Sequence, residues 1–243
     1  MSPHSTFADV LAERLRHDAG RPLVTFYDDT TGERVELSVT TYANWVAKAG
    51  SLLVDELGLE RGDTIRVDLP PHWMSTVFLG AAWTAGLVLT DSDAPQAVVC
   101  GPGGLDAWAP VAGSVEVLAC SLLPLGVRFA DPVPGGAHDV GVEIWSQPDA
   151  FVPYDPPVGA DDATALDGRT SSQEALIGAA AAGSLLTDGG RLLSTANPAS
   201  PPGLATFLEP LVRGGSLVLV ARADPQRLEA INIAERATDR FPA

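Results

Sequence analysis

The amino-acid sequence predicts an α/β fold with a mostly parallel sheet and flanking helices, and three observations lead to this prediction. Strand-like and helix-like segments alternate through the first hundred residues, which is typical of parallel strands joined by helices. Residues 216–220 contain a continuous Leu-Val-Leu-Val run, as expected for a strand buried on both faces. Hydrophobic residues make up 46% of the 243-residue chain and charged residues 19%, which indicates a packed globular protein.

The N-terminal elements follow from spacing and turn signals. Residues 6–18 place apolar side chains at helical intervals and predict an amphipathic helix. Residues 23–27 and 34–38 flank a polar turn cluster and predict a hairpin. Thr41 is a candidate cap for a long helix that ends near Leu57.

Five short apolar runs beside turn residues are expected to form one core sheet. They are residues 65–69, 87–90, 97–100, 191–194 and 216–220. Leu217 and Leu219 are therefore expected to be buried.

The remaining segments set the domain organisation. Residues 101–157 are rich in glycine and proline and predict a loop-rich connection with one or two strands, and residues 155–168 resemble an exposed linker. We therefore expect a single domain over residues 1–243, with two lobes at about 1–157 and 158–243.

The last third of the chain carries clear helix-start signals. Ser171 and Glu174 fit a capping box for a helix over residues 172–186. Asp224 is expected to cap a final helix, with Pro225 at its first position.

The balance of charge excludes several classes of partner. The sequence has 31 acidic and 15 basic residues, a formal net charge of −16, and a pI of about 4.4. Nucleic acids and anionic membrane surfaces require basic patches, so we expect neither as a partner. The chain starts without a basic and apolar leader, and the apolar residues 77–90 are too short to span a bilayer, which favours a cytoplasmic protein.

General signatures of catalysis are missing. The four histidines lack metal-binding spacing, and no G-x-S-x-G motif is present. Cys100 and Cys120 end apolar runs and are expected to be reduced and buried. Residues 101–104 (GPGG) lack the Lys-Ser/Thr of a phosphate loop, so we expect a turn there. These patterns identify no catalytic, cofactor-binding or metal-binding residue.

Several segments nevertheless resemble motifs of one family, in that family's order. Residues 41–45 (TYANW) look like T-Y-x-E-L, and residues 57–65 (LGLERGDTI) are similar to L-G-V-x-x-G-D-x-V. Residues 81–89 (AAWTAGLVL) look like A-x-x-K-A-G-A-V-x-V, and residues 209–219 (EPLVRGGSLVL) like P-L-x-x-G-x-x-V-V-L. The chain thus resembles part of the N-terminal domain of the acyl-adenylate-forming superfamily, which includes the AMP-binding acyl-CoA synthetases. Shorter matches lie at residues 69–72, 193–204 and 231–238.

The resemblance also exposes departures from the family. It implies an ATP-phosphate loop of the type Y-T-S-G-T-T-G-x-P-K-G at residues 163–172, but this segment reads ATALDGRTSS. The family's Mg²⁺-serving glutamate and the catalytic lysine of its C-terminal domain have no counterpart in the sequence, whose only lysine, Lys48, is expected within an early helix. Because such groups neutralise the charge of ATP and pyrophosphate, we expect no adenylation.

Two functions follow from this resemblance. The first is a truncated, catalytically degenerate pseudoenzyme, similar to the short single-domain actinobacterial homologues, that binds a small ligand or a protein and needs no cofactor. The alternative is an acyl-CoA synthetase-like enzyme that binds AMP or ATP with Mg²⁺ and a carboxylate, and is complete only with a partner chain. The missing phosphate loop favours the first.

The resemblance places a candidate pocket in the loop before residue 204. In the family this loop carries a residue that lines the acyl pocket, and Ser200 falls at the position of the family's histidine, three residues before Gly203. Asn197, Ser200 and Gly203 are therefore the expected pocket-lining residues. A proline-rich loop that only joins a strand to a helix is the competing interpretation.

Overall fold

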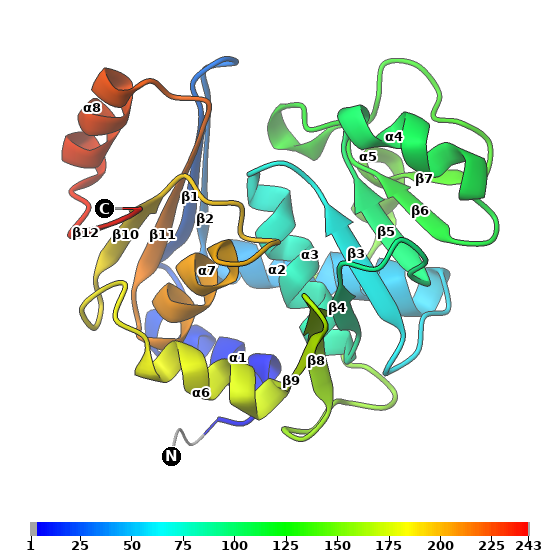
Figure 1. Cartoon of the computed structure of the whole chain (residues 1–243), viewed down its shortest axis with the longest axis horizontal. Helices are drawn as coiled ribbons and strands as arrows, with labels where there is room; N and C mark the ends of the chain where they lie inside the picture. Colours follow the sequence, from blue (N-terminus) through cyan, green and yellow to red (C-terminus); the bar gives the residue numbers. More distant parts are fainter. Residues whose placement is uncertain (1–3, 243) are drawn as a thin grey trace.

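The computed structural model describes residues 4–242, which form two twisted β-sheets with helices between and outside them (Figure 1). The strands of the first sheet are β1 (Pro22–Asp28), β2 (Glu33–Ser38), β10 (Arg191–Ser194), β11 (Ser216–Ala221) and β12 (Asp239–Phe241). Their order is β12-β10-β11-β1-β2, and the β1–β2 hairpin supplies the antiparallel pair. The predicted hairpin is therefore confirmed.

The second sheet has seven strands. They are β3 (Thr64–Asp68), β4 (Val88–Thr90), β5 (Ala97–Cys100), β6 (Glu116–Ala119), β7 (Ala137–Asp139), β8 (Asp162–Leu166) and β9 (Arg169–Ser172). Their order is β7-β6-β5-β3-β4-β8-β9, with β8 and β9 antiparallel. The predicted α/β class is confirmed, but the single core sheet is wrong, because β11 pairs with β1 and β10 pairs with β11.

Helices fill the space between the sheets and cover their outer faces. They are α1 (Phe7–Asp18), α2 (Val39–Ser51), α3 (Trp73–Ala85), α4 (Pro102–Trp108), α5 (Val140–Glu143), α6 (Gln173–Ala182), α7 (Gly203–Val212) and α8 (Pro225–Glu235). Figure 1 shows α2, α3 and α7 between the sheets, α1 and α6 along one end, and α8 outside the five-stranded sheet. This arrangement buries Leu217 and Leu219 completely, as predicted.

Helix α3 lies at the centre of the core because it is apolar on all sides. Its Trp83 indole donates to the Ala163 carbonyl oxygen of β8 at 3.0 Å. The buried Gln173 amide donates to the Trp83 carbonyl oxygen at 2.8 Å, and its oxygen accepts from the Phe7 amide at 3.0 Å. One glutamine thus joins α1, α3 and α6.

Two predicted helix starts are wrong by a few residues. Ser38, not Thr41, caps α2, and its hydroxyl accepts from the Thr41 amide at 3.1 Å. Ser172, not Ser171, caps α6, which ends at Ala182 rather than near residue 186. The reason at α6 is tertiary, because strand β9 pairs with β8 and holds Ser171 in extended conformation.

The predicted linker at residues 155–168 is also wrong in its second half. Ala163 and Thr164 of β8 are buried, and β8 pairs with β4 through Thr164 and Ala165 in the second sheet. Residues 101–157 contain two strands, β6 and β7, within the predicted range of one or two, but the expected turn at residues 101–104 is the start of α4. The two lobes at 1–157 and 158–243 stay a prediction, and the sheets themselves do not divide at that point, because β8 and β9 belong with β3 to β7.

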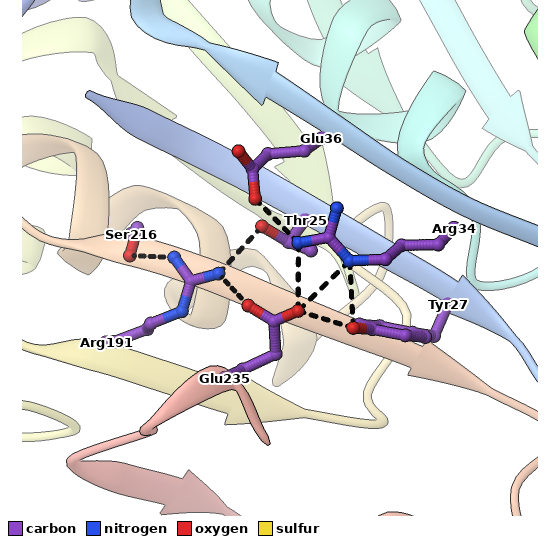
Figure 2. A network of polar contacts seen from close by, with 7 residues as sticks. All are labelled: Thr25, Tyr27, Arg34, Glu36, Arg191, Ser216 and Glu235. Atoms are coloured by element: carbon purple, nitrogen blue, oxygen red, sulfur yellow. Dashed lines mark hydrogen bonds and ion pairs between the residues drawn. The ribbon is translucent and has the colours of Figure 1, made fainter. Parts of the chain in front are cut away.

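Helix α8 is fixed to the outer face of the five-stranded sheet by apolar and polar contacts. Leu228 and Ile231 pack on strands β10 and β11, and Asp224 caps the helix as predicted. At the other end, Figure 2 shows the Glu235 carboxylate between Tyr27, Arg34 and Arg191. Burial raises the pKa of Glu235, but the hydrogen bonds that it accepts outweigh burial and hold its pKa below the usual value, so the carboxylate stays ionised.

Candidate binding cleft

A cavity of about 970 Å³ lies where the carboxyl ends of strands from both sheets meet. Residues at the ends of six strands line it: Asp28 of β1, Asp68 of β3, Gly101 after β5, Ser121 after β6, Thr195 after β10 and Ala221 of β11. In open α/β sheets this edge is where ligands bind, because loops after parallel strands converge there. We call this cavity the cleft.

The cleft combines apolar walls with charged groups. Phe26, Leu69 and Val220 are among its apolar lining residues. The Asp28 carboxylate is almost fully buried and accepts from the Arg222 guanidinium, with Nε at 3.0 Å from Oδ1. Arg222 has φ +59°, a left-handed conformation that costs a non-glycine residue about 1–2 kcal/mol.

The second carboxylate of the cleft, Asp68, is held by a neighbouring indole. Trp108 donates from Nε1 to Asp68 Oδ2 at 2.7 Å. The Arg66 guanidinium lies 5.4 Å from the centroid of the Trp108 ring and also pairs with Asp93 at 2.7 Å. Asp68 therefore has a fixed orientation at the end of β3.

His72 forms part of the cleft wall as a neutral side chain. Its Nδ1 accepts from the Met74 amide at 3.2 Å, so the ring proton lies on Nε2. Burial lowers the pKa of His72 to about 4, and the Phe26 ring packs against the imidazole at 4.7 Å between centroids. Glu33 Oε2 lies 4.0 Å from Nε2, and burial raises the pKa of that carboxyl group. The cleft thus contains an uncharged imidazole at neutral pH.

The structure separates the three residues expected to line a pocket from the cleft. Asn197 uses its side chain to hold the loop, because Nδ2 donates to the Leu69 carbonyl at 2.8 Å and Oδ1 accepts from the Ala199 amide at 3.0 Å. Ser200 is exposed, and Gly203 packs so closely on Asn197 that a Cβ would lie 1.8 Å from its carbonyl oxygen. Thr195, two residues before Asn197, does line the cleft.

Sequence reasoning missed Asp28, Asp68, His72 and Arg222. A usable signal was present for the two aspartates, since Asp28 directly follows the predicted strand 23–27 and Asp68 is the last but one residue of the predicted strand 65–69. Polar residues at the ends of parallel strands commonly face a ligand. No sequence signal brings the two sheets together, so the shared cleft could not be inferred from the strands alone.

The segment expected to replace the phosphate loop is a tight hairpin. Strands β8 and β9 are joined by Asp167 and Gly168, both with positive φ of +51° and +69°. The Asp167 amide donates to Asp91 Oδ2 at 2.8 Å, which fixes the turn against the loop after β4. Positive φ at both central residues is typical of the two-residue hairpin turn that follows strand twist.

Lys48 lies on α2, as predicted, and its ammonium group is already bound. It donates to the Gln147 carbonyl oxygen and pairs with Asp149 at 3.1 Å. Within residues 4–242, no cluster of three or more His, Cys, Asp or Glu side chains is arranged to hold a metal ion. Cys100 and Cys120 are unpaired and buried, as predicted, and burial raises the pKa of Cys100 to about 11.

In the part of the chain that the structure describes, no helix has the length and apolar character needed to cross a membrane.

Comparisons with known proteins agree with the fold. No family model matches the sequence. The structure resembles an acyl-CoA synthetase from Brucella canis, with a TM-score of 0.81 and 17% identity over 97% of this chain and 46% of that protein. It also resembles the anthranilate CoA ligase AuaEII in complex with anthranoyl-AMP, with a TM-score of 0.74 and 12% identity over 96% of this chain and 48% of the ligase. The chain therefore spans about half the length of these enzymes.

A relative of the same length comes from Mycobacterium tuberculosis strain H37Rv, where it is described as a TIGR03089 family protein. The two sequences are 38% identical over 248 aligned residues, which cover 98% of each chain. The chain described here therefore belongs to the TIGR03089 family, and it has the fold of the N-terminal part of acyl-CoA synthetases.

Proposed function

We propose that this protein binds a small organic carboxylate in the cleft and does not by itself join that carboxylate to ATP. The observation that carries the proposal is the β8–β9 hairpin, whose two-residue turn stands where the resemblance implies a glycine-rich phosphate loop. A phosphate loop holds its ligand by several converging backbone amides. At this turn the Asp167 amide is already used by Asp91.

Charge supports the same conclusion. Adenylation develops negative charge on the α-phosphate and on the leaving pyrophosphate, so the site must supply cations or amides that stabilise it. Removing one such group commonly costs about 10²–10³ in rate. The only lysine is bound to Gln147 and Asp149, and the net charge of −16 repels a polyanion.

The cleft has the features that a carboxylate with an apolar body requires. Phe26, Leu69 and Val220 offer apolar surface, and Arg222 and Arg240 offer guanidinium groups. The side chain of Arg222 is 59% exposed despite its pair with Asp28, so part of the guanidinium faces solvent. The solved ligase in complex with anthranoyl-AMP makes anthranilate a natural probe.

The test is a calorimetric titration of the purified protein with anthranilate, octanoate, ATP and AMP, together with carboxylate-dependent ATP–pyrophosphate exchange in the presence of Mg²⁺. We expect a carboxylate to bind without ATP, and Arg222→Gln to weaken that binding about tenfold, the scale of one charged hydrogen bond. Arg236→Gln is the matched control, since Arg236, the C-cap residue of α8, has the same left-handed backbone but does not line the cleft.

Two results would contradict the proposal. The first is exchange above the protein-free control that Lys48→Ala abolishes, which would make the chain a compact synthetase. The second is the absence of carboxylate binding at any concentration up to solubility. Exchange that appears only after a separate synthetase C-terminal domain is added would instead support the alternative of an enzyme completed by a partner chain.

A further inference from the structure

A second cavity, of about 500 Å³, is separate from the cleft and is lined by several tryptophans. Trp45 of α2, Trp73 at the start of α3 and Trp145 after α5 all line it, which is three of the five tryptophans in the chain. Trp45 packs edge-to-face on Trp73 at 5.1 Å between centroids and on Trp145 at 5.3 Å. We call this cavity the indole cavity.

The three indoles differ sharply in exposure. Trp73 is 1% exposed, whereas Trp145 is 53% exposed. Leaving half of an indole in water forgoes the free energy that burying such a large apolar ring provides. Trp145 therefore presents an aromatic surface, held in place by Trp45, that an incoming ring would cover.

The charged residues of the cavity wall are already paired with one another. Lys48 contacts Asp149 at 3.1 Å, and Arg34 contacts Glu36 at 2.7 Å. Arg34 also belongs to the network that fixes Glu235, shown in Figure 2. A ligand therefore meets neither an unpaired cation nor an unpaired carboxylate in this wall, so the wall favours an uncharged molecule over an ion.

We propose that the indole cavity is a binding site for a small, planar, uncharged aromatic molecule. Its volume lies within the range of small-molecule sites, and edge-to-face or offset contacts with indoles favour an aromatic ring over a saturated one of equal size. This site shares none of its lining residues with the cleft, so its test does not depend on whether the cleft binds a carboxylate.

The probe for this site is 2-naphthol, and decahydro-2-naphthol is its control, because it has the same carbon skeleton without π electrons. Protein labelled with 5-fluorotryptophan gives one fluorine resonance for each indole. We expect 2-naphthol to shift the resonances of Trp45, Trp73 and Trp145 with one saturation curve. Trp83 and Trp108 are internal controls, since their indoles donate to Ala163 and Asp68 and neither residue lines this cavity.

Variants sharpen the test. Trp145→Leu keeps apolar bulk but removes the ring, and we expect it to raise the dissociation constant for 2-naphthol about tenfold, whereas Trp145→Phe recovers most of the affinity. Val142→Ala is the matched control, because Val142 is equally exposed on α5 but does not line the cavity. Since Trp145 is half exposed, these variants are expected to fold.

Three outcomes would overturn the proposal. Equal affinity for the saturated control would reduce the cavity to a general apolar patch. Shifts confined to Trp83 or Trp108 would place the ligand elsewhere. A Trp145 resonance that moves on dilution of the free protein, and that 2-naphthol does not affect, would identify this face as an interface between copies of the chain.

Discussion

Two stretches of the same sheet edge are built in opposite ways. At the carboxyl ends of β3, β5 and β6 the chain continues into loops or a helix start, and a cavity of about 970 Å³ opens toward the five-stranded sheet. At the end of β8 the chain reverses within two residues, and the turn is tied to the loop after β4. The comparison teaches that one edge of an α/β sheet can open into a cavity at some strands and be closed by a tight turn at another.

This difference predicts which substitutions affect stability and which affect ligand binding. Residues of the hairpin and the helix after it are expected to contribute to folding alone. Residues at the cleft are expected to change binding or pH dependence, with smaller or conditional effects on stability.

The largest effect is expected on the hairpin side, at Gln173. Gln173→Leu removes both hydrogen bonds of a completely buried amide and leaves the Phe7 amide and the Trp83 carbonyl without partners. Each buried group left unpaired costs about 1–3 kcal/mol, so we expect a loss of about 4 kcal/mol in the free energy of unfolding. Urea denaturation measures it. A loss below about 1 kcal/mol would show that α1 and α3 are held together by packing rather than by this amide.

A pH-dependent effect is expected on the cleft side, at His72. Burial lowers its pKa from 6.5 to about 4, so the unfolded chain binds the proton more tightly than the native one. The neutral His72 side chain therefore makes its full contribution to the free energy of unfolding above about pH 6.5. As the pH falls toward 4, that free energy decreases by about 3 kcal/mol. Glu33, whose pKa is raised by burial, acts in the opposite direction.

The measurement for His72 is the difference in unfolding free energy between the wild type and His72→Asn, taken at several pH values. Asparagine retains the ability to cap α3. We expect the wild type to lose stability relative to the variant between pH 6.5 and 4, the range of the pKa change. Parallel curves for the two proteins would mean that His72 is accessible to protons in the native state.

A smaller effect is expected at the hairpin turn. Gly168 has φ +69°, so Gly168→Val places a β-branched residue in the left-handed region at a cost of about 1–2 kcal/mol. Gly178→Val is the control in an ordinary backbone conformation on α6, where a Cβ meets no neighbour and valine has a somewhat better helix propensity than glycine, so we expect no loss of stability. Carboxylate affinity should be the same in the wild type and Gly168→Val; a weaker affinity would connect the turn to the cleft.

The smallest effect on stability is expected at Arg222, where two contributions oppose each other. Arg222→Gly relieves the left-handed backbone but removes the ion-pair partner of Asp28. The Thr30 amide still donates to Asp28 Oδ1 at 3.0 Å, and water can replace the 59% exposed arginine side chain, so we expect the unfolding free energy to change by less than about 1 kcal/mol. At Arg236, which is exposed in the same conformation, Arg236→Gly should stabilise the protein by up to about 1 kcal/mol. A large loss at Arg222 would show that Asp28 depends on the ion pair.

The sequence by itself determined the fold class and several of the elements. The Leu-Val run of β11, the capped start of α8 and the apolar α3 all follow from local periodicity and capping, which depend on residues near in sequence. The segment ATALDGRTSS likewise led to the prediction, through the resemblance, that the glycine-rich loop is missing, because composition is visible without a structure.

Only the tertiary structure decided which strands pair with one another and which residues meet in the cleft. Pairing between β1 and β11 joins residues almost two hundred positions apart, and it splits the predicted core into two sheets. Pairing of β8 with β4 made a strand of the predicted linker, and the β8–β9 hairpin placed the cap of α6 at Ser172. The meeting of the two sheets brought Asp28, Asp68 and His72 to one cleft. The physical reason is that strand partners and cavities depend on contacts between distant segments, which no local pattern records.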